Sequence, residues 1–186
     1  MRGFLIGIFF AMGCLSPTIA KTSWENYLDL PTTENANLVV AISFSPKADS
    51  SEDRRDLRIL QIQIYGGDRG AIRLVYRLRH TDDASLLEEL NTILARSIRS
   101  NPRLFLEEAS RAQLSDDALK GIILTPGLEY IDRPAAKLYE IEMRYEGLRG
   151  LDLDLTNLEA FREKSLRLLK AAIDKNRLRL PERIAP

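Results

Sequence analysis

The sequence has very few residues of the kinds that carry most catalytic and metal chemistry. Among its 186 residues there is one cysteine, Cys14, and one histidine, His80. A lone cysteine forms no disulfide within the chain, and a lone histidine cannot build the multi-histidine or thiolate ligand sets of zinc sites. Glycine-rich phosphate fingerprints, GxSxG turns and HExxH motifs are also missing from the sequence. We therefore expect no catalytic residue of these classes, no metal site and no cofactor.

The chain also lacks a surplus of charge of either sign. It carries 27 basic and 27 acidic residues, so its formal net charge is zero. Proteins that hold nucleic acid through its phosphates usually carry a basic surplus. We therefore expect no nucleic-acid partner.

The first twenty residues have the layout of a secretory signal peptide. Arg2 gives a positive start, residues 3–15 are uncharged and almost wholly apolar, and residues 16–20 are small or polar. The apolar run is shorter than the roughly 20 residues that a membrane-spanning helix needs. We expect no transmembrane helix, a signal peptide at residues 1–20 and a single helical domain at residues 21–186.

Two processing routes are open for this leader. Cleavage after Ala20 would release a cysteine-free protein into the periplasm or the medium. Alternatively, residues 11–14 (AMGC) resemble the lipobox of bacterial lipoproteins. That resemblance implies lipidation at Cys14 and a membrane-anchored lipoprotein.

Residues 81–112 predict two amphipathic helices with almost no linker between them. Pro102 disfavours a helical conformation at Asn101, which ends the first helix, and it suits the first position of the second. We expect Thr81 to cap the first helix and Asn101 the second. In the first helix the apolar residues recur at offsets of three and four and share one face, whereas the charged residues lie largely elsewhere: Leu86, Leu87, Leu90, Ile93, Leu94 and Ile98 against Glu88, Glu89, Arg96 and Arg99.

Residues 57–79 are ambiguous between a β-hairpin and two helices. The stretches LRILQIQIY and AIRLVYRLR both alternate, with GGDRG between them, which is a hairpin signal. They also fit helices, with Gly66 ending the first and Asp68 capping the second. We favour two helices because an isolated two-stranded hairpin is marginally stable.

The rest of the chain contains further sequence signals for the start and the end of helices. A short helix is predicted behind Ser23. Another is favoured over residues 34–43, although the apolar run at residues 38–42 could equally be a strand. One begins at Ser115, one at Pro134 with Leu138, Ile141, Tyr145 and Leu148 inward, and the last runs from a capping box at Thr156 and Glu159 to about Leu178. The start at Ser115 repeats the one at Thr81 after 34 residues, a period typical of helical-hairpin arrays. We expect an all-α fold, either a compact bundle or a short irregular solenoid of antiparallel helix pairs.

One candidate binding site stands out in this sequence. Arg69, Arg73 and Arg77 are spaced four apart, which makes a single stripe on a helix. Arginine forks suit phosphate and carboxylate groups. The stripe therefore fits docking to an anionic envelope component or an acidic protein. The structural alternative is a solvated face whose arginines pair with glutamates and aspartates of neighbouring segments.

These features support one leading functional hypothesis and one alternative. The leading hypothesis is an exported cell-envelope protein that acts as a non-enzymatic binding or scaffold module for an anionic partner. The alternative is a carboxylate-based hydrolase acting on cell-wall polymer. That enzyme would need a cleft with two facing carboxylates, at least one of them with a raised pKa.

Overall fold

The computed structural model describes residues 22–39, 51–127, 130, 132–153 and 156–178. Within these ranges the regular structure is helical and contains no strand, which confirms the all-α prediction. The predicted signal peptide and Cys14 lie outside the described residues. The helices are α1 (Ser23–Asp29), α2 (Thr33–Leu38), α3 (Ser51–Tyr65), α4 (Arg69–Leu78), α5 (Ala84–Ser100), α6 (Pro102–Arg111), α7 (Asp116–Ile123), α8 (Pro134–Arg149) and α9 (Thr156–Arg177).

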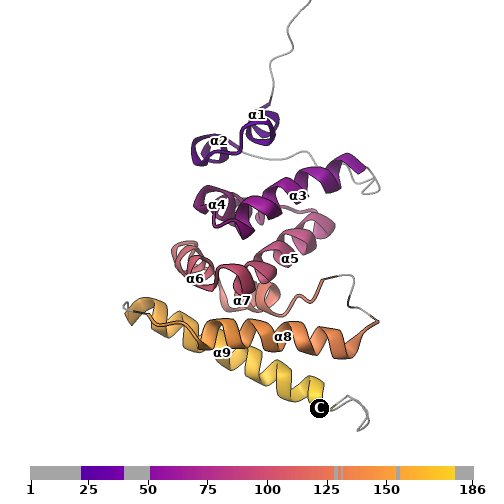
Figure 1. Ribbon diagram of the computed structural model, residues 1–186, viewed down its shortest axis with the longest axis vertical. Coiled ribbons are helices and arrows are strands. Elements are labelled where there is room, and N and C mark those ends of the chain that lie inside the picture. Colours follow the sequence, from indigo (N-terminus) through magenta and orange to yellow (C-terminus); the bar gives the residue numbers. More distant parts are fainter. Residues whose placement is uncertain (1–21, 40–50, 128–129, 131, 154–155, 179–186) are drawn as a thin grey trace, which may run out of the picture.

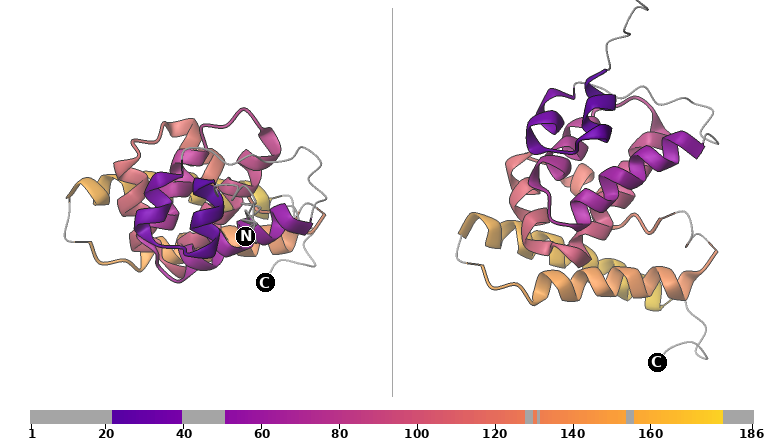
Figure 2. Two further views of the ribbon diagram at one scale, coloured as in Figure 1. Left: turned by 90° about the horizontal axis from the view of Figure 1, so that it is seen from above. Right: turned by 45° about the horizontal axis from the view of Figure 1, so that its top comes forward.

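The helices form a stack that follows the order of the chain. Figure 1 shows α1 and α2 at one end, then α3 and α4, then α5 to α7, and α8 with α9 at the other end. The oblique view in Figure 2 shows the same succession. One continuous cluster of buried apolar side chains runs from Tyr27 in α1 to Ile173 in α9. This arrangement matches a short irregular solenoid of helix pairs, in which each pair buries its apolar stripes against its neighbours.

The helix pair predicted at residues 81–112 lies at the centre of the stack. Helix α5 packs against α3, α4, α6, α7 and α8. The apolar residues of its stripe are buried except for Leu87, which is partly exposed; Leu90, Leu94 and Ile98 are fully inaccessible to solvent. Because α5 reaches both halves of the molecule, it brings side chains of α3 and α8 to a common place.

Residues 57–79 form two helices, so the hairpin alternative is wrong. The stripe of α4 is buried as helical spacing requires, with Ala71, Leu74 and Val75 at zero exposure. Asp68 caps α4 as predicted, because its side chain accepts a hydrogen bond of 2.6 Å from the Ala71 N–H. The turn before it depends on Gly67, whose φ of 89° is a left-handed conformation that glycine adopts without strain.

Helix α2 is shorter than the predicted 34–43, and it lies directly on α4. It starts behind Thr32, whose hydroxyl accepts from the Asn35 N–H, and it ends at Leu38. The close approach depends on Gly70 of α4, because a Cβ atom there would be 2.7 Å from the Thr33 Cα. Only glycine allows the two backbones this near to each other.

In the central pair the predicted cap of α5 is wrong, and Asn101 is the N-cap residue of α6 by position but not by a side-chain bond. The N-cap of α5 is Asp83, whose carboxylate accepts from the N–H groups of Ser85 and Leu86. Thr81 lies two residues too early and accepts from the Asp83 N–H instead. Asn101 makes no side-chain cap on α6.

Asn101 closes the C-terminal end of α3 instead. Its Nδ2 donates to the carbonyls of Ile64 at 3.3 Å and Tyr65 at 2.9 Å. The last carbonyls of a helix have no partner within that helix, so a side-chain donor there stabilises its end. These bonds tie the end of α3 to the junction of α5 and α6. They hold Tyr65 beside the second half of α5.

Candidate anion-binding site

The predicted stripe exists on α4, and each of its three guanidinium groups has partners within the chain. Arg69 reaches Glu108 Oε1 through Nη1 and Glu107 Oε2 through Nη2, both at 2.6 Å. Arg73 Nε lies 2.8 Å from Glu108 Oε2. Arg77 donates to the carbonyls of Asn37 and Ala36 at the end of α2.

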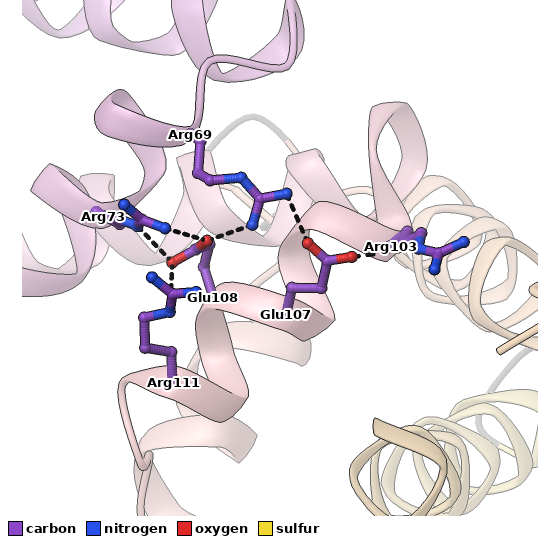
Figure 3. A network of polar contacts seen from close by, with 6 residues as sticks. All are labelled: Arg69, Arg73, Arg103, Glu107, Glu108 and Arg111. Atoms are coloured by element: carbon purple, nitrogen blue, oxygen red, sulfur yellow. Dashed lines mark hydrogen bonds and ion pairs between the residues drawn. The ribbon is translucent and has the colours of Figure 1, made fainter. Parts of the chain in front are cut away.

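Glu108 is the centre of this network, which Figure 3 shows from close by. Its side chain is 1% exposed, and Arg111 approaches it from the next turn of α6 at 3.6 Å. Burial alone would raise the pKa of Glu108. The hydrogen bonds from Arg73 and Arg69 outweigh that effect and hold the pKa below its ordinary value. Glu108 is therefore a charged carboxylate that joins α4 to α6.

The arginines of the stripe thus connect α4 to the helices packed on either side of it. Arg69 and Arg73 direct their donors at two glutamates of α6, and Arg77 directs its donors at α2. These contacts within the chain are what we expect if the arginines of the stripe pair with neighbouring segments and not with an external ligand. Docking of an anionic partner to the stripe stays a prediction.

A second group of arginines surrounds a hollow between α3, α5 and α8. The hollow has a volume of about 370 Å³ and borders the loop that connects α7 to α8. We call it the arginine pocket; its lining residues are Tyr65, Arg96, Arg99, Ser100, Tyr130 and Glu140.

Two polar contacts organise the wall of the arginine pocket. Arg99 Nη1 lies 2.7 Å from Glu140 Oε1, which joins α5 to α8. The Tyr65 hydroxyl accepts from Gln61 Nε2 at 3.0 Å and also hydrogen-bonds with Arg96. Glu140 is almost fully buried, whereas Arg99 is 41% exposed. The wall therefore presents guanidinium groups to solvent and keeps its carboxylate inside.

Behind this wall lies Arg144, a fully buried arginine of α8. Its Nη1 donates to the carbonyls of Ile123 at 3.0 Å and Thr125 at 2.7 Å, where α7 ends. The negative end of the α7 dipole favours a cation at that place. Its Nε and Nη2 atoms are also buried, and they have no hydrogen-bond partner among the described residues.

Four pocket residues act on the charge of Arg144. The pKa of Arg144 is lowered to about 10, chiefly by burial and also by the charges of Arg96 and Arg99, while Glu140 and Tyr65 act in the opposite direction. Arg144 therefore stays protonated at neutral pH. Arg96, Arg99 and Arg144 therefore lie close enough for their charges to act on one another, and Glu140 is the carboxylate among the residues that line the hollow.

Sequence reasoning did not single out this group. Arg96 and Arg99 looked like ordinary solvent-facing residues of α5. In α8 the predicted inward residues included Tyr145, which is only half-buried, whereas Arg144 is buried completely. A signal was present, because Arg144 stands three residues after Ile141 and four before Leu148, on the same apolar face. An arginine within an apolar stripe points to a buried charge.

Neither a membrane span nor a metal cluster is found in the part of the chain that the structure describes. No helix there is both long and apolar enough to cross a membrane. No group of three or more His, Cys, Asp or Glu side chains there is placed to hold a metal ion. Comparisons with protein-family models, curated proteins and solved structures found no match for this chain. A function has therefore to be inferred from the chemistry of the two arginine groups.

Proposed function

We propose that this chain is a non-enzymatic binding module of the cell envelope that takes an anionic ligand in the arginine pocket. This proposal keeps the class of partner that the sequence predicts and moves the site from α4 to the space between α3, α5 and α8. The observation that carries it is Arg144, a buried cation beside Arg96 and Arg99 whose Nε and Nη2 have no hydrogen-bond partner in the part of the chain that the structure describes.

A buried charge of this kind needs compensation. Transfer of an ion from water into a protein interior costs several kcal/mol unless an opposite charge and hydrogen bonds offset it. The carboxylate that acts on Arg144 is Glu140, and Glu140 already pairs with Arg99 at 2.7 Å. An anion in the pocket would supply the missing negative charge.

The two arginine groups differ in how well they are neutralised. In the network on α4 and α6, the buried carboxylate of Glu108 receives Arg69 and Arg73 at 2.6 and 2.8 Å. Beside the arginine pocket, the buried Arg144 has Nε and Nη2 atoms with no hydrogen-bond partner among the described residues. This difference favours the pocket over the stripe on α4 as the place where an anion binds.

The hydrolase alternative gains no support from the described carboxylates. A general acid at neutral pH needs a raised pKa. The pKa values of Glu107 and Glu108 are shifted, but both are lowered by their arginine partners. The described carboxylates therefore favour the binding function over the enzymatic one.

The binding function is tested by two substitutions with opposite expected signs. Arg99→Gln removes a cation that lines the pocket and is expected to weaken anion binding. Glu140→Gln removes the carboxylate among the described pocket residues and is expected to strengthen anion binding about tenfold. A unit charge about 6 Å away contributes about 2–3 kcal/mol at an effective dielectric constant of about 20, before salt screens it.

The assay is the rise in melting temperature that phosphate, phenyl phosphate or benzoate produces, since a ligand that binds only the folded state stabilises it. Arg167→Gln is the matched control, because Arg167 is exposed on α9 and lines a different hollow. It should leave binding unchanged. The proposal fails if no anion stabilises the protein, or if both pocket variants weaken binding equally.

A further inference from the structure

Glu140 lies between two arginines, one at the wall of the arginine pocket and one behind it in the same helix. We infer that Glu140 is an exchangeable counter-ion, which pairs with Arg99 in the structure and moves to Arg144 once an anion takes Arg99. This inference rests on the proposed function and deepens it, because it states how the site responds to its ligand.

The pairing that the structure shows joins two helices through an exposed arginine. Arg99 Nη1 of α5 lies 2.7 Å from Glu140 Oε1 of α8. The Arg99 side chain is 41% exposed, whereas the Glu140 side chain is only 7% exposed. Arg99 can therefore meet a ligand that comes from solvent, while the carboxylate of Glu140 is shielded from water and depends on a partner within the protein.

Arg144 offers that carboxylate a second place on the same helix. Residues four apart in a helix are neighbours, and an acidic residue that precedes a basic one at this spacing is the favourable order. Arg144 Nη1 is used by the carbonyls of Ile123 and Thr125. Its Nε and Nη2 atoms are buried and have no hydrogen-bond partner among the described residues.

Nε and Nη2 form one edge of a guanidinium group, and a carboxylate can accept from both of them at once. The same protein uses this geometry between α4 and α6. There Arg73 donates through Nε at 2.8 Å and through Nη2 at 3.1 Å to the two oxygens of Glu108. The open edge of Arg144 therefore has the donors that a carboxylate needs.

An anion at Arg99 changes which pairing of Glu140 is favourable. The ligand and Glu140 would then carry like charges against one guanidinium group, and like charges a few ångströms apart repel each other. A buried carboxylate without a partner is costly as well. A move to Arg144 removes both penalties, and the negative charge that the anion brings thus reaches the buried cation through Glu140. The two groups are already near each other, since Glu140 acts to raise the pKa of Arg144.

The exchange connects the pocket to the packing of the helices. It breaks the ion pair between α5 and α8 and forms a pair within α8, where Arg144 is bonded to the carbonyls at the end of α7. Anion binding would then change a contact between two layers of the stack and not the pocket wall alone.

The first test needs no ligand. Arg99→Gln removes the ionic partner of Glu140 and so imitates an occupied Arg99. In the full chain, the Nε–H of Arg144 should exchange with water at least about tenfold more slowly in this variant, measured by NMR, because a hydrogen bond to a charged group has to open first. A crystal structure of the variant should place a Glu140 oxygen about 2.7–2.9 Å from Arg144 Nε or Nη2.

Two further variants separate the exchange of partners from other effects. When Glu140→Gln is added to Arg99→Gln, the carboxylate is gone, and the Arg144 signal should return to the wild-type rate. Arg167→Gln removes an exposed arginine of α9 and should leave the signal unchanged. Unchanged exchange at Arg144 in Arg99→Gln overturns the inference. If Arg99→Gln does not fold, the ligand experiment decides alone.

The ligand experiment adds inorganic phosphate to the wild type and to Glu140→Gln. Phosphate should slow the Arg144 signal in the wild type but not in Glu140→Gln, although it binds both. Slowing in both proteins means that the anion itself bonds to Arg144, and binding without any slowing means that Glu140 stays with Arg99. Either result overturns the inference and leaves the proposed function standing. Slowing in Arg99→Gln without binding of any anion overturns the proposed function but supports the exchange of partners.

Discussion

The buried carboxylate of Glu108 gives the sharpest test of how the stack is held together. Glu108→Gln keeps the size of the side chain and removes its charge, so Arg69 and Arg73 lose their ionic partner. A hydrogen bond to a charged group contributes about 1.5–3 kcal/mol, and breaking a fully buried ion pair costs about 3–5 kcal/mol. Because Arg69 and Arg73 are 45% and 31% exposed, both cations regain water when the charge is lost. We therefore expect a loss near the lower end, about 2–3 kcal/mol.

The neighbouring residue supplies a matched control. Glu107 accepts from the same Arg69 and from Arg103, but its side chain is 23% exposed, and its partners are 45% and 50% exposed. Ion pairs at a surface contribute about 0–1 kcal/mol. In a domain of this size each kcal/mol lowers the melting temperature by about 2–4 °C. Glu108→Gln should then lower it by about 4–12 °C and Glu107→Gln by about 4 °C or less, measured by circular dichroism.

The dependence on pH identifies the charge as the cause. The folded-state pKa of Glu108 is lowered from 4.5, so the unfolded chain binds more protons in the window below that value. The contribution of Glu108 to stability is therefore complete above the ordinary pKa and is lost as the pH falls through the folded-state pKa. Urea unfolding at several pH values should show the wild type and Glu108→Gln converging in acid. A gap that persists there, or equal losses in the two glutamate variants, would refute the electrostatic explanation.

Two further predictions concern the contact between α2 and α4. Gly70→Ala should destabilise the protein by about 1–3 kcal/mol in urea unfolding, because the new Cβ atom would overlap the Thr33 backbone at 2.7 Å. Gly121→Ala, in an open part of α7 where the nearest atom is 4.0 Å away, should instead stabilise it by about 0.5–1 kcal/mol through helix propensity. Arg77→Ala should cost about 1 kcal/mol and speed hydrogen exchange in α2, because it removes the donors to the last carbonyls of that helix. Unchanged exchange in α2 would show that Arg77 does not hold it.

Local patterns in the sequence predict most of the helices but not the way in which their ends are used. The stripe of α4 is readable because its apolar residues, Ala71, Leu74, Val75 and Leu78, follow helical spacing and are all buried. Asn101 was assigned to the helix that follows it, since a cap rule considers only neighbours in the sequence. Its actual acceptors lie 36 and 37 residues earlier, at the end of α3. That choice depends on tertiary packing, which periodicity does not contain.

The same limit explains why the arginine pocket was missed and the stripe on α4 was found. Arg69, Arg73 and Arg77 belong to one helix, so their spacing alone brings them together. Arg96 and Arg99 belong to α5 and Arg144 belongs to α8, more than forty residues later, and only the packing of α5 against α8 brings them together. Arg144 alone left a local sign, a charge within an apolar stripe. A charged residue in such a stripe indicates that a partner lies elsewhere in the fold. Periodicity cannot say where that partner is.

The contrast between the two arginine groups rests on their partners rather than on their number. Around Glu108 the cations meet carboxylates within hydrogen-bond distance, and the product is a rigid contact between α4 and α6. Around Arg144 the described residues supply two carbonyls at the end of α7 and the nearby carboxylate of Glu140, and among them Nε and Nη2 find no hydrogen-bond partner. A protein gains no stability from a buried cation that is only partly compensated. The presence of Arg144 beside a hollow is explained if a bound anion compensates the rest of its charge. Binding of the anion should then raise the stability of the folded protein.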